Sequence, residues 1–192
     1  MNKLRTLLLS ALAIIAVCLT ACAQTRKEQT MKGSKVLVAY FSATGTTKAA
    51  AQRLASVTDG ELYEIQPEQP YTDADLDWND RQSRSSVEMN NPQSRPAIKG
   101  KKENMADYDV VFIGYPIWWN LAPTIVNTFI ESYDLKGKTV IPFATSGGSS
   151  IGNSVSALKK AYPEIRWCDG KLLNRASEKS IREWVDEVLK LV

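Results

Sequence analysis

Three long apolar runs, each followed by a loop and a helical segment, constrain the fold of this 192-residue chain. Residues 35–41 read KVLVAYF, residues 108–114 read YDVVFIG and residues 138–144 read KTVIPFA. Apolar runs without alternation are typical of strands that are buried on both faces of a parallel sheet. Pro142, inside the third run, is a mild objection to a strand because proline removes one ladder donor.

Two weaker strands and four helices complete the pattern. Residues 60–65 are more polar and indicate an edge strand, and residues 165–172 form a strand interrupted by Asp169-Gly170. Helical spacing of apolar residues predicts helices over 46–57, from Pro123 onward, over 154–162 and over 177–191. Strands that alternate with helices imply an α/β fold with a parallel sheet covered on both faces.

Residues 67–107 break this rhythm. They are polar and rich in Asp, Asn, Ser and Arg, where a single helix would suffice to connect two strands. A connection of this length is more often functional or disordered than idle.

The first 21 residues have the pattern of a secretory signal peptide. A basic start precedes an apolar run at residues 7–19, which is short for a transmembrane helix. The run ends in LTAC at residues 19–22, which resembles the lipobox of bacterial lipoproteins. That resemblance implies cleavage before Cys22 and its modification by lipid. A plain secretory signal with a chance cysteine is the alternative.

The same pattern predicts the location and organisation of the mature chain. Residues 22–33 are polar and without periodicity, as expected of a flexible tether, and residues 34–192 form one domain. We expect an exported, membrane-anchored lipoprotein on the periplasmic or cell-surface side. Its membrane contact would run through the lipid anchor only.

Composition excludes several classes of function. The chain has no histidine, which excludes Ser-His-Asp and Cys-His catalysis and histidine metal sites. Without Lys3 and Arg5 the mature chain carries 22 basic and 21 acidic side chains, a net charge of +1. That charge gives no electrostatic case for binding nucleic acid. Cys168 lies in an apolar stretch and is expected to be packed rather than reactive.

Ligands of open parallel sheets bind beyond the carboxyl ends of the strands, so the loops there are informative. The first such loop, residues 42–47, reads SATGTT and opens a helix. Hydroxyls and backbone N–H groups at a helix N-terminus make an anion site, and Gly45 permits a tight turn. The loop lacks the Gly-Lys-Ser/Thr ending of a Walker A loop. The alternative is a turn whose Ser and Thr only cap the helix.

Two further loops complete the edge. Residues 114–123 contain the adjacent tryptophans Trp118 and Trp119, which suit stacking on a flat ligand. The alternatives are a hydrophobic cap over the core and a protein interface. Residues 145–153 read TSGGSSIGN, and their glycines free the backbone to hydrogen-bond the edge of a planar ring. A flexible connection is the alternative for this third loop.

Taken together, the three loops resemble those of the flavodoxin-like family, over residues 34–192. The resemblance implies a three-layer sandwich whose five-stranded parallel sheet has the order 2-1-3-4-5. It also implies one FMN, bound non-covalently at the edge where the strands end. No metal and no catalytic side chain are implied.

The resemblance assigns a role to each loop. The phosphate would be held by Ser42, Thr44, Gly45, Thr46 and Thr47. The ring would contact the second loop through Pro116, Ile117, Trp118 and Trp119, with Asn120 beside them. The polar edge of the ring would lie along Thr145, Ser146, Gly147, Gly148 and Gly152.

The chain departs from the family in two respects. The third loop has no aromatic residue, so one face of the ring is open unless Tyr71 or Trp78 from residues 67–107 closes it. Basic residues also lie near the expected site: Lys48, Arg81, Arg84 and Arg95. We expect these to be solvated; contact of the three arginines with an anionic substrate is the alternative.

The expected function is electron transfer through FMN, with either a redox partner protein or a small aromatic electron acceptor. Whether the chain is a carrier or an enzyme stays open. An enzyme would be an NAD(P)H-dependent reductase of quinone-like or nitroaromatic compounds. A lipoprotein binding module without flavin is the rival from another class. Exposed aromatic residues near the ring would suit a homodimer.

Overall fold

The structure is a computed structural model that describes residues 33–190. The predicted signal peptide, Cys22 and nearly all of the tether lie outside the described residues. Six strands form one parallel sheet: β1 (Val36–Tyr40), β2 (Glu61–Glu64), β3 (Val110–Pro116), β4 (Thr139–Thr145), β5 (Arg166–Trp167) and β6 (Lys171–Leu172). Their order is β2-β1-β3-β4-β5, with β6 also paired to β4. The predicted α/β fold and strand order are confirmed.

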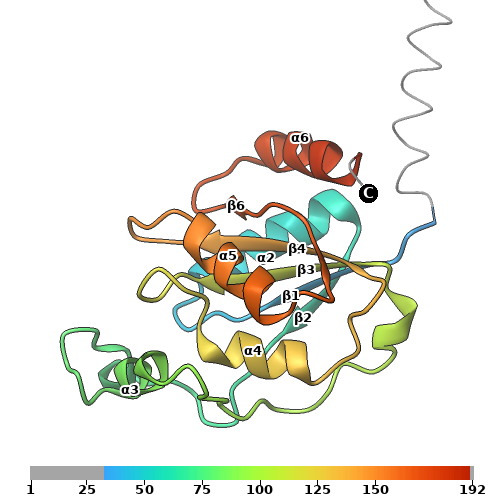
Figure 1. The fold of residues 1–192 in the computed structure, drawn as a ribbon. Helices are drawn as coiled ribbons and strands as arrows, with labels where there is room; N and C mark the ends of the chain where they lie inside the picture. The colour runs from blue at the N-terminus through green and yellow to red at the C-terminus, as the bar shows by residue number, and fades with distance from the viewer. Residues whose placement is uncertain (1–32, 191–192) are drawn as a thin grey trace, which may run out of the picture. The chain divides into compact units, whose positions relative to one another are not determined.

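Helices cover both faces of this sheet (Figure 1). α2 (Thr46–Thr58) and α6 (Glu178–Leu189) pack on one face, and α4 (Thr124–Glu131) and α5 (Gly152–Ala161) lie on the other. Ser177 caps α6 by accepting a hydrogen bond from the Ser180 N–H. Pro123 is the N-cap residue of α4, one position before the first turn. Among residues 33–190, no helix combines the length and hydropathy that a membrane span requires.

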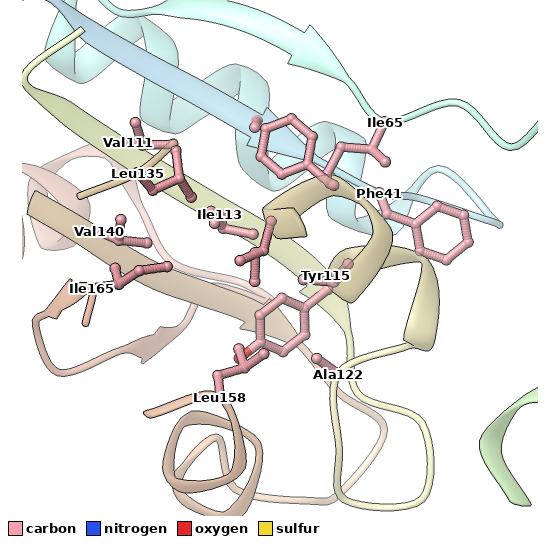
Figure 2. Packing of buried hydrophobic residues seen from close by; sticks show 14 of the residues in the cluster. Phe41, Ile65, Val111, Ile113, Tyr115, Ala122, Leu135, Val140, Leu158 and Ile165 are labelled. Atoms are coloured by element: carbon pink, nitrogen blue, oxygen red, sulfur yellow. The ribbon is translucent and has the colours of Figure 1, made fainter. Parts of the chain in front are cut away.

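The strands are apolar throughout because each face packs on helices. Val111, Ile113 and Tyr115 project from one face of β3, and Figure 2 shows Tyr115 close to Leu158 of α5. On the opposite face, Phe112 meets the Trp184 ring of α6 edge-on, with the ring centroids 5.8 Å apart. Every residue of β1 and β4 is buried, so alternation of polar and apolar residues would be destabilising there.

The split of the fifth strand into β5 and β6 follows from Pro142 of β4. The N–H groups of Cys168 and Leu173, the residues that follow β5 and β6, donate hydrogen bonds of 2.9 Å to the carbonyls of Val140 and Ala144. Pro142 lies between them and faces the same neighbour, but it has no N–H to donate. The ladder is interrupted after Cys168 and resumes at β6, and a Cβ on Gly170 would lie only 2.9 Å from the Pro142 carbonyl oxygen. The predicted interruption at Asp169-Gly170 is therefore confirmed.

The crossover from β2 to β3 contains a closed lobe. Pro67 and Ile98 form an antiparallel bridge, with Glu68 N–H donating to the Ala97 carbonyl at 2.8 Å. We call residues 68–97, which this bridge closes, the lobe. The lobe contains the short 3-10 helix η1 (Ala74–Leu76) and α3 (Arg84–Asn90); a second short helix, η2 (Met105–Asp107), follows it. In Figure 1, α3 lies at the end of the sheet where β1, β3 and β4 finish.

Candidate functional site

The loop after β1 forms a tight turn into α2. The Gly45 N–H donates to the Ser42 Oγ at 3.1 Å, and Gly45 has a φ of 87°. This left-handed conformation favours glycine, and an added Cβ would have no neighbour within 4 Å. Helix α2 starts at Thr46 without a side-chain cap. The first N–H groups of any helix lack an intrahelical acceptor, and here no N-cap side chain satisfies them.

Electrostatics at this helix start favour an anion. The first turn of α2 contains no acidic residue, so nothing opposes the positive end of the helix dipole. The Lys48 Nζ lies 3.2 Å from the Glu64 Oε2 and is paired rather than free. The Tyr40 hydroxyl also donates to Glu64, and burial raises the pKa of Tyr40 to about 12. Tyr40 thus stays neutral, and an anion here would rely on backbone N–H groups and threonine hydroxyls.

The tryptophan loop after β3 is a two-residue hairpin turn. Trp118 and Leu121 exchange backbone hydrogen bonds of 3.0 and 2.9 Å. The two central residues, Trp119 and Asn120, have φ values of 46° and 64°. Positive φ at both positions is typical of a type I′ turn, and Asn adopts it readily. For a bulky residue such as Trp119 this conformation is strained, which marks a position set by its surroundings.

The two tryptophans have different environments. Trp118 packs edge-on against Phe41 and Tyr71, with ring centroids 5.6 and 5.4 Å away. Trp119 is 47% exposed at the tip of the turn. Trp118 thus extends the core beneath the loop, whereas Trp119 is free to stack on a ligand. Trp118 agrees with the interpretation of the loop as a hydrophobic cap, whereas stacking of Trp119 on a ligand or its contact with a protein stays a prediction.

The loop after β4 is ordered by two side chains. The Ser146 Oγ accepts hydrogen bonds from the N–H groups of Gly148 (3.1 Å) and Ser149 (2.7 Å). Asn174 accepts a hydrogen bond from the Ser146 N–H at 2.9 Å and donates one to the Ser146 carbonyl. The sequence analysis did not single out Asn174, because a lone Asn in a loop carries no periodic or motif signal. These hydrogen bonds give the loop a defined conformation.

A cleft of about 370 Å³ joins the first two loops to the lobe. Its lining consists of Ala43, Thr44, Thr47, Leu76, Trp78, Ser85, Pro116, Ile117, Trp118 and Trp119. No charged side chain lines it. Its size is within the range of pockets that take small molecules or cofactors.

The structure brings together part of the predicted site. Of the predicted residues, the cleft is lined by Thr44, Thr47, Pro116, Ile117, Trp118 and Trp119. Ser42 lines a neighbouring cleft of about 310 Å³, together with Tyr71 and Lys99. The remaining predicted residues line neither of these two clefts: Gly45, Thr46, Asn120, Thr145, Ser146, Gly147, Gly148 and Gly152.

The lobe supplies lining residues that the sequence analysis missed. Leu76 and Ser85 line the cleft beside Trp78, which is 73% exposed. Closure of the site by Trp78 or Tyr71 was the alternative to an open ring face; Tyr71 lies against Trp118 and does not line this cleft. Isolated apolar residues within a polar insertion were the only sequence signal for this wall.

Two of the three arginines of the lobe, Arg84 and Arg95, are engaged within the protein. The Arg84 Nε lies 2.7 Å from the Glu88 Oε1, and Arg95 makes two hydrogen bonds of 2.8 and 2.9 Å to Glu131. The sequence analysis expected both guanidiniums to be solvated; instead each is bound by a carboxylate, and neither is free for an anionic substrate. Arg81 is exposed.

The remaining chemistry of the described chain is sparse. Cys168 is half-buried, and burial raises the pKa of its thiol, as expected for a packed rather than a reactive cysteine. Residues 33–190 contain no cluster of acidic or cysteine side chains that could hold a metal ion.

Comparison with known proteins identifies the family. The sequence model of the flavodoxin family matches residues 35–188. The chain belongs to the flavodoxin family. The predicted resemblance is therefore confirmed, and membership of this family supports FMN as the cofactor. No curated protein matches the chain.

Solved structures place this flavodoxin-family chain among close relatives. A protein from Bacteroides eggerthii, assigned as a flavoprotein, is 68% identical with a TM-score of 0.80, over 81% of this chain and 98% of that one. One from Bacteroides uniformis is 59% identical with a TM-score of 0.78, over 80% and 98%. A flavoprotein from Lactobacillus acidophilus, solved in complex with FMN, is 23% identical with a TM-score of 0.66, over 81% and 98%. At that identity the likeness shows the fold.

The residues present fit a ligand that has a phosphate and a flat ring. The uncapped start of α2 and the open space at Gly45 suit the phosphate. The apolar wall with the exposed Trp119 suits the ring, and the same cleft contacts both Thr44 and Trp119.

Proposed function

We propose that this flavodoxin-family protein binds one FMN in the cleft and functions in electron transfer. The observation that carries the proposal is the cleft itself, which connects an uncapped helix start to an exposed tryptophan. The FMN complex of the Lactobacillus acidophilus flavoprotein, which shares the fold, supports this assignment.

The loop after β1 would hold the phosphate. The N–H groups at the start of α2 and the hydroxyls of Thr44 and Thr46 are the donors that the loop offers. Thr44 and Thr46 lie on the exposed side of the loop with their hydroxyl oxygens 3.4 Å apart, so both can turn to one anion. Backbone donors at a helix start bind phosphate without a paired cation, which agrees with the engagement of Lys48 by Glu64.

The loops after β3 and β4 would orient the ring. Trp119 offers a flat, half-exposed surface, and Ile117 and Pro116 line the cleft beneath it. The backbone of residues 146–149, held by Asn174, would offer N–H and carbonyl groups to the polar edge of the ring.

The chemistry itself belongs to the cofactor. FMN, when bound, accepts and donates electrons singly or as a hydride. The chain contributes binding, orientation and exclusion of water, and none of its cleft residues is a proton donor or acceptor near neutral pH. This agrees with the absence of histidine from the chain.

Titration of the apoprotein tests the proposal. Full-length protein in mild detergent would be titrated with FMN and, separately, with riboflavin, following flavin fluorescence. We expect quenching that saturates at one equivalent of FMN and much weaker binding of riboflavin, which lacks the phosphate. Gly45→Ala should weaken the binding of FMN more than that of riboflavin, and so reduce the difference between the two affinities, because it strains the phosphate loop alone. Absence of quenching would reject FMN and favour the binding module without flavin.

The finer assignment to a carrier or an enzyme needs a second assay. We propose the carrier, with a redox partner protein, as the first candidate. Steady turnover of NADH or NADPH by the FMN-loaded protein, with a quinone or nitroaromatic acceptor, would contradict it. It would establish the reductase instead.

The location is a separate proposal. We infer from LTAC at residues 19–22 that the chain is exported and anchored through lipid on Cys22. Cells fed a labelled fatty acid should incorporate the label into the wild-type chain and not into Cys22→Ser. Labelling of both would contradict the assignment.

A further inference from the structure

Backbone hydrogen bonds join the two segments through which the chain enters and leaves the lobe. The Glu68 N–H donates to the Ala97 carbonyl, and the Lys99 N–H donates to the Gln66 carbonyl at 2.7 Å. Arg95, near the end of the lobe, is bound bidentately by Glu131 of α4. Residues 68–97 are therefore anchored at their base to the sheet domain.

A second set of contacts lies inside the lobe, around Tyr71. Its hydroxyl donates to the Glu88 Oε2 at 2.5 Å, and the Arg84 guanidinium lies over its ring, 4.0 Å from the centroid. Arg84 also donates to Glu88 and to the Gln69 carbonyl, both at 2.7 Å. Burial raises the pKa of Tyr71, so the hydroxyl remains a donor. We call Tyr71, Arg84 and Glu88 the latch.

The latch connects α3 to the floor of the cleft. The Tyr71 ring contacts Trp118 and Phe41, with centroids 5.4 and 5.6 Å away. The Glu88 and Arg84 side chains are only 12% and 22% exposed. Charged side chains this well covered, with several hydrogen bonds each, fix geometry more than they add stability. The latch therefore sets where α3 lies relative to Trp118.

The lobe presents one large side chain to the cleft. Trp78 is 73% exposed although it lines the cleft, and Trp119 lines the same cleft from another segment. Tryptophan left this exposed is unfavourable unless a ligand or partner covers it. The loop of residues 145–153 has no aromatic side chain, so within the described residues the cleft has aromatic walls only from the lobe and the tryptophan loop.

We propose that the lobe is the second wall of the ring site: Trp78 covers the ring face opposite Trp119, and the latch positions Trp78. The proposal rests on the proposed binding of FMN in this cleft. It has one functional consequence. A ring covered on both faces exchanges electrons through its edge, which favours a protein partner over a flat acceptor stacked on the ring.

Flavin affinities of lobe variants test the wall. Dissociation constants for FMN and riboflavin would be measured for the full-length wild-type chain, Trp78→Ala and Trp78→Phe. We expect Trp78→Ala to raise the dissociation constants of both ligands by the same factor, roughly tenfold, because it removes a contact to the ring and leaves the phosphate loop intact. Trp78→Phe should recover most of the loss. Val87→Ala is the matched control, because Val87 is 55% exposed on α3 and does not line the cleft.

A double-mutant cycle tests the latch. Glu88→Gln alone should weaken riboflavin binding several-fold, and in the Trp78→Ala background it should add little, because both changes remove the same wall. Additive losses would show that Glu88 does not act through Trp78 and would overturn the positioning role. Wild-type riboflavin affinity in Trp78→Ala would overturn the wall, and Trp78, being exposed, can be replaced without unfolding the chain. A wild-type chain that binds neither flavin would overturn the proposed function and this proposal with it.

Discussion

The hydroxyl oxygens of Thr47 and Thr145 lie 2.8 Å apart in the protein interior, although 98 positions separate the two residues. Thr47 is in the first turn of α2, and Thr145 is the last residue of β4. Both side chains are at most 3% exposed. This one hydrogen bond fixes the start of α2 to the end of β4, the strand that leads into the loop of residues 145–153.

Removal of one partner should destabilise the protein. Thr145→Val keeps the shape of the side chain but leaves the buried Thr47 hydroxyl without a partner, which costs about 1–3 kcal/mol of unfolding free energy. Urea denaturation would measure the loss. The double variant Thr47→Val/Thr145→Val should lose less than the sum of the single variants. Thr44→Val, at an exposed position, should change stability by at most about 0.5 kcal/mol. Strictly additive losses would show that the two hydroxyls do not interact.

Close packing across the sheet makes a second prediction at Gly114 of β3. A Cβ at this position would lie 2.1 Å from the Phe143 Cζ. Gly114→Ala should therefore lower the free energy of unfolding by about 1–3 kcal/mol through overpacking. Addition of Phe143→Leu to this variant should recover part of the loss. Gly147→Ala is the matched control, since its Cβ would meet nothing within 4 Å. A Gly114→Ala chain as stable as the control would contradict this packing.

The central strands of the sheet could be predicted from the sequence because burial leaves a strong pattern, whereas their order was implied by the resemblance to the flavodoxin-like family. Strands β1, β3 and β4 are covered on both faces, so their apolar runs are unbroken. The exact ends were less predictable. β3 continues to Pro116, two residues past the expected end, because its register with β4 runs through Thr145. That pairing is a tertiary fact with no local signal.

The candidate site was predictable only where it is local in sequence. The turn at Gly45 and the exposed Trp119 follow from residues next to one another. The lining that the lobe contributes could not be predicted in the same way. Leu76 and Ser85 line the cleft in a lobe that is closed by the bridge between Pro67 and Ile98, a pairing between residues far apart in the sequence. The roles assigned to Thr145, Ser146, Gly147, Gly148 and Gly152 stay predictions.

The environment of Cys168 predicts slow thiol chemistry. Burial raises the pKa of this thiol, and the nearby Arg166 opposes the shift only in part. A raised pKa means less thiolate at a given pH, so iodoacetamide should react slowly with the native protein at pH 8 and rapidly with the urea-unfolded protein. Mass spectrometry of a Cys18→Ser/Cys22→Ser variant would follow Cys168 alone. Equal rates in the native and unfolded states would contradict the inferred burial.

The pair of Arg95 and Glu131, which joins the lobe to α4, predicts a pH dependence of stability. The hydrogen bond from Arg95 is the main cause that lowers the pKa of Glu131, and the Tyr162 hydroxyl also donates to this carboxylate. A lowered pKa stabilises the folded state above the usual carboxyl pKa, and this contribution disappears as pH falls through the folded-state value. Glu131 is 42% exposed, so the contribution is at most about 1 kcal/mol.

Urea midpoints of the wild type and Glu131→Gln should therefore differ at pH 7 and converge as pH falls below about 4. Glu183→Gln, on the exposed pair of Lys179 and Glu183, is the control and should change little at either pH. A wild type that is less stable than Glu131→Gln at pH 7, or equally stable there, would show that the charged carboxylate is not stabilising, and that its pair with Arg95 does not anchor the lobe.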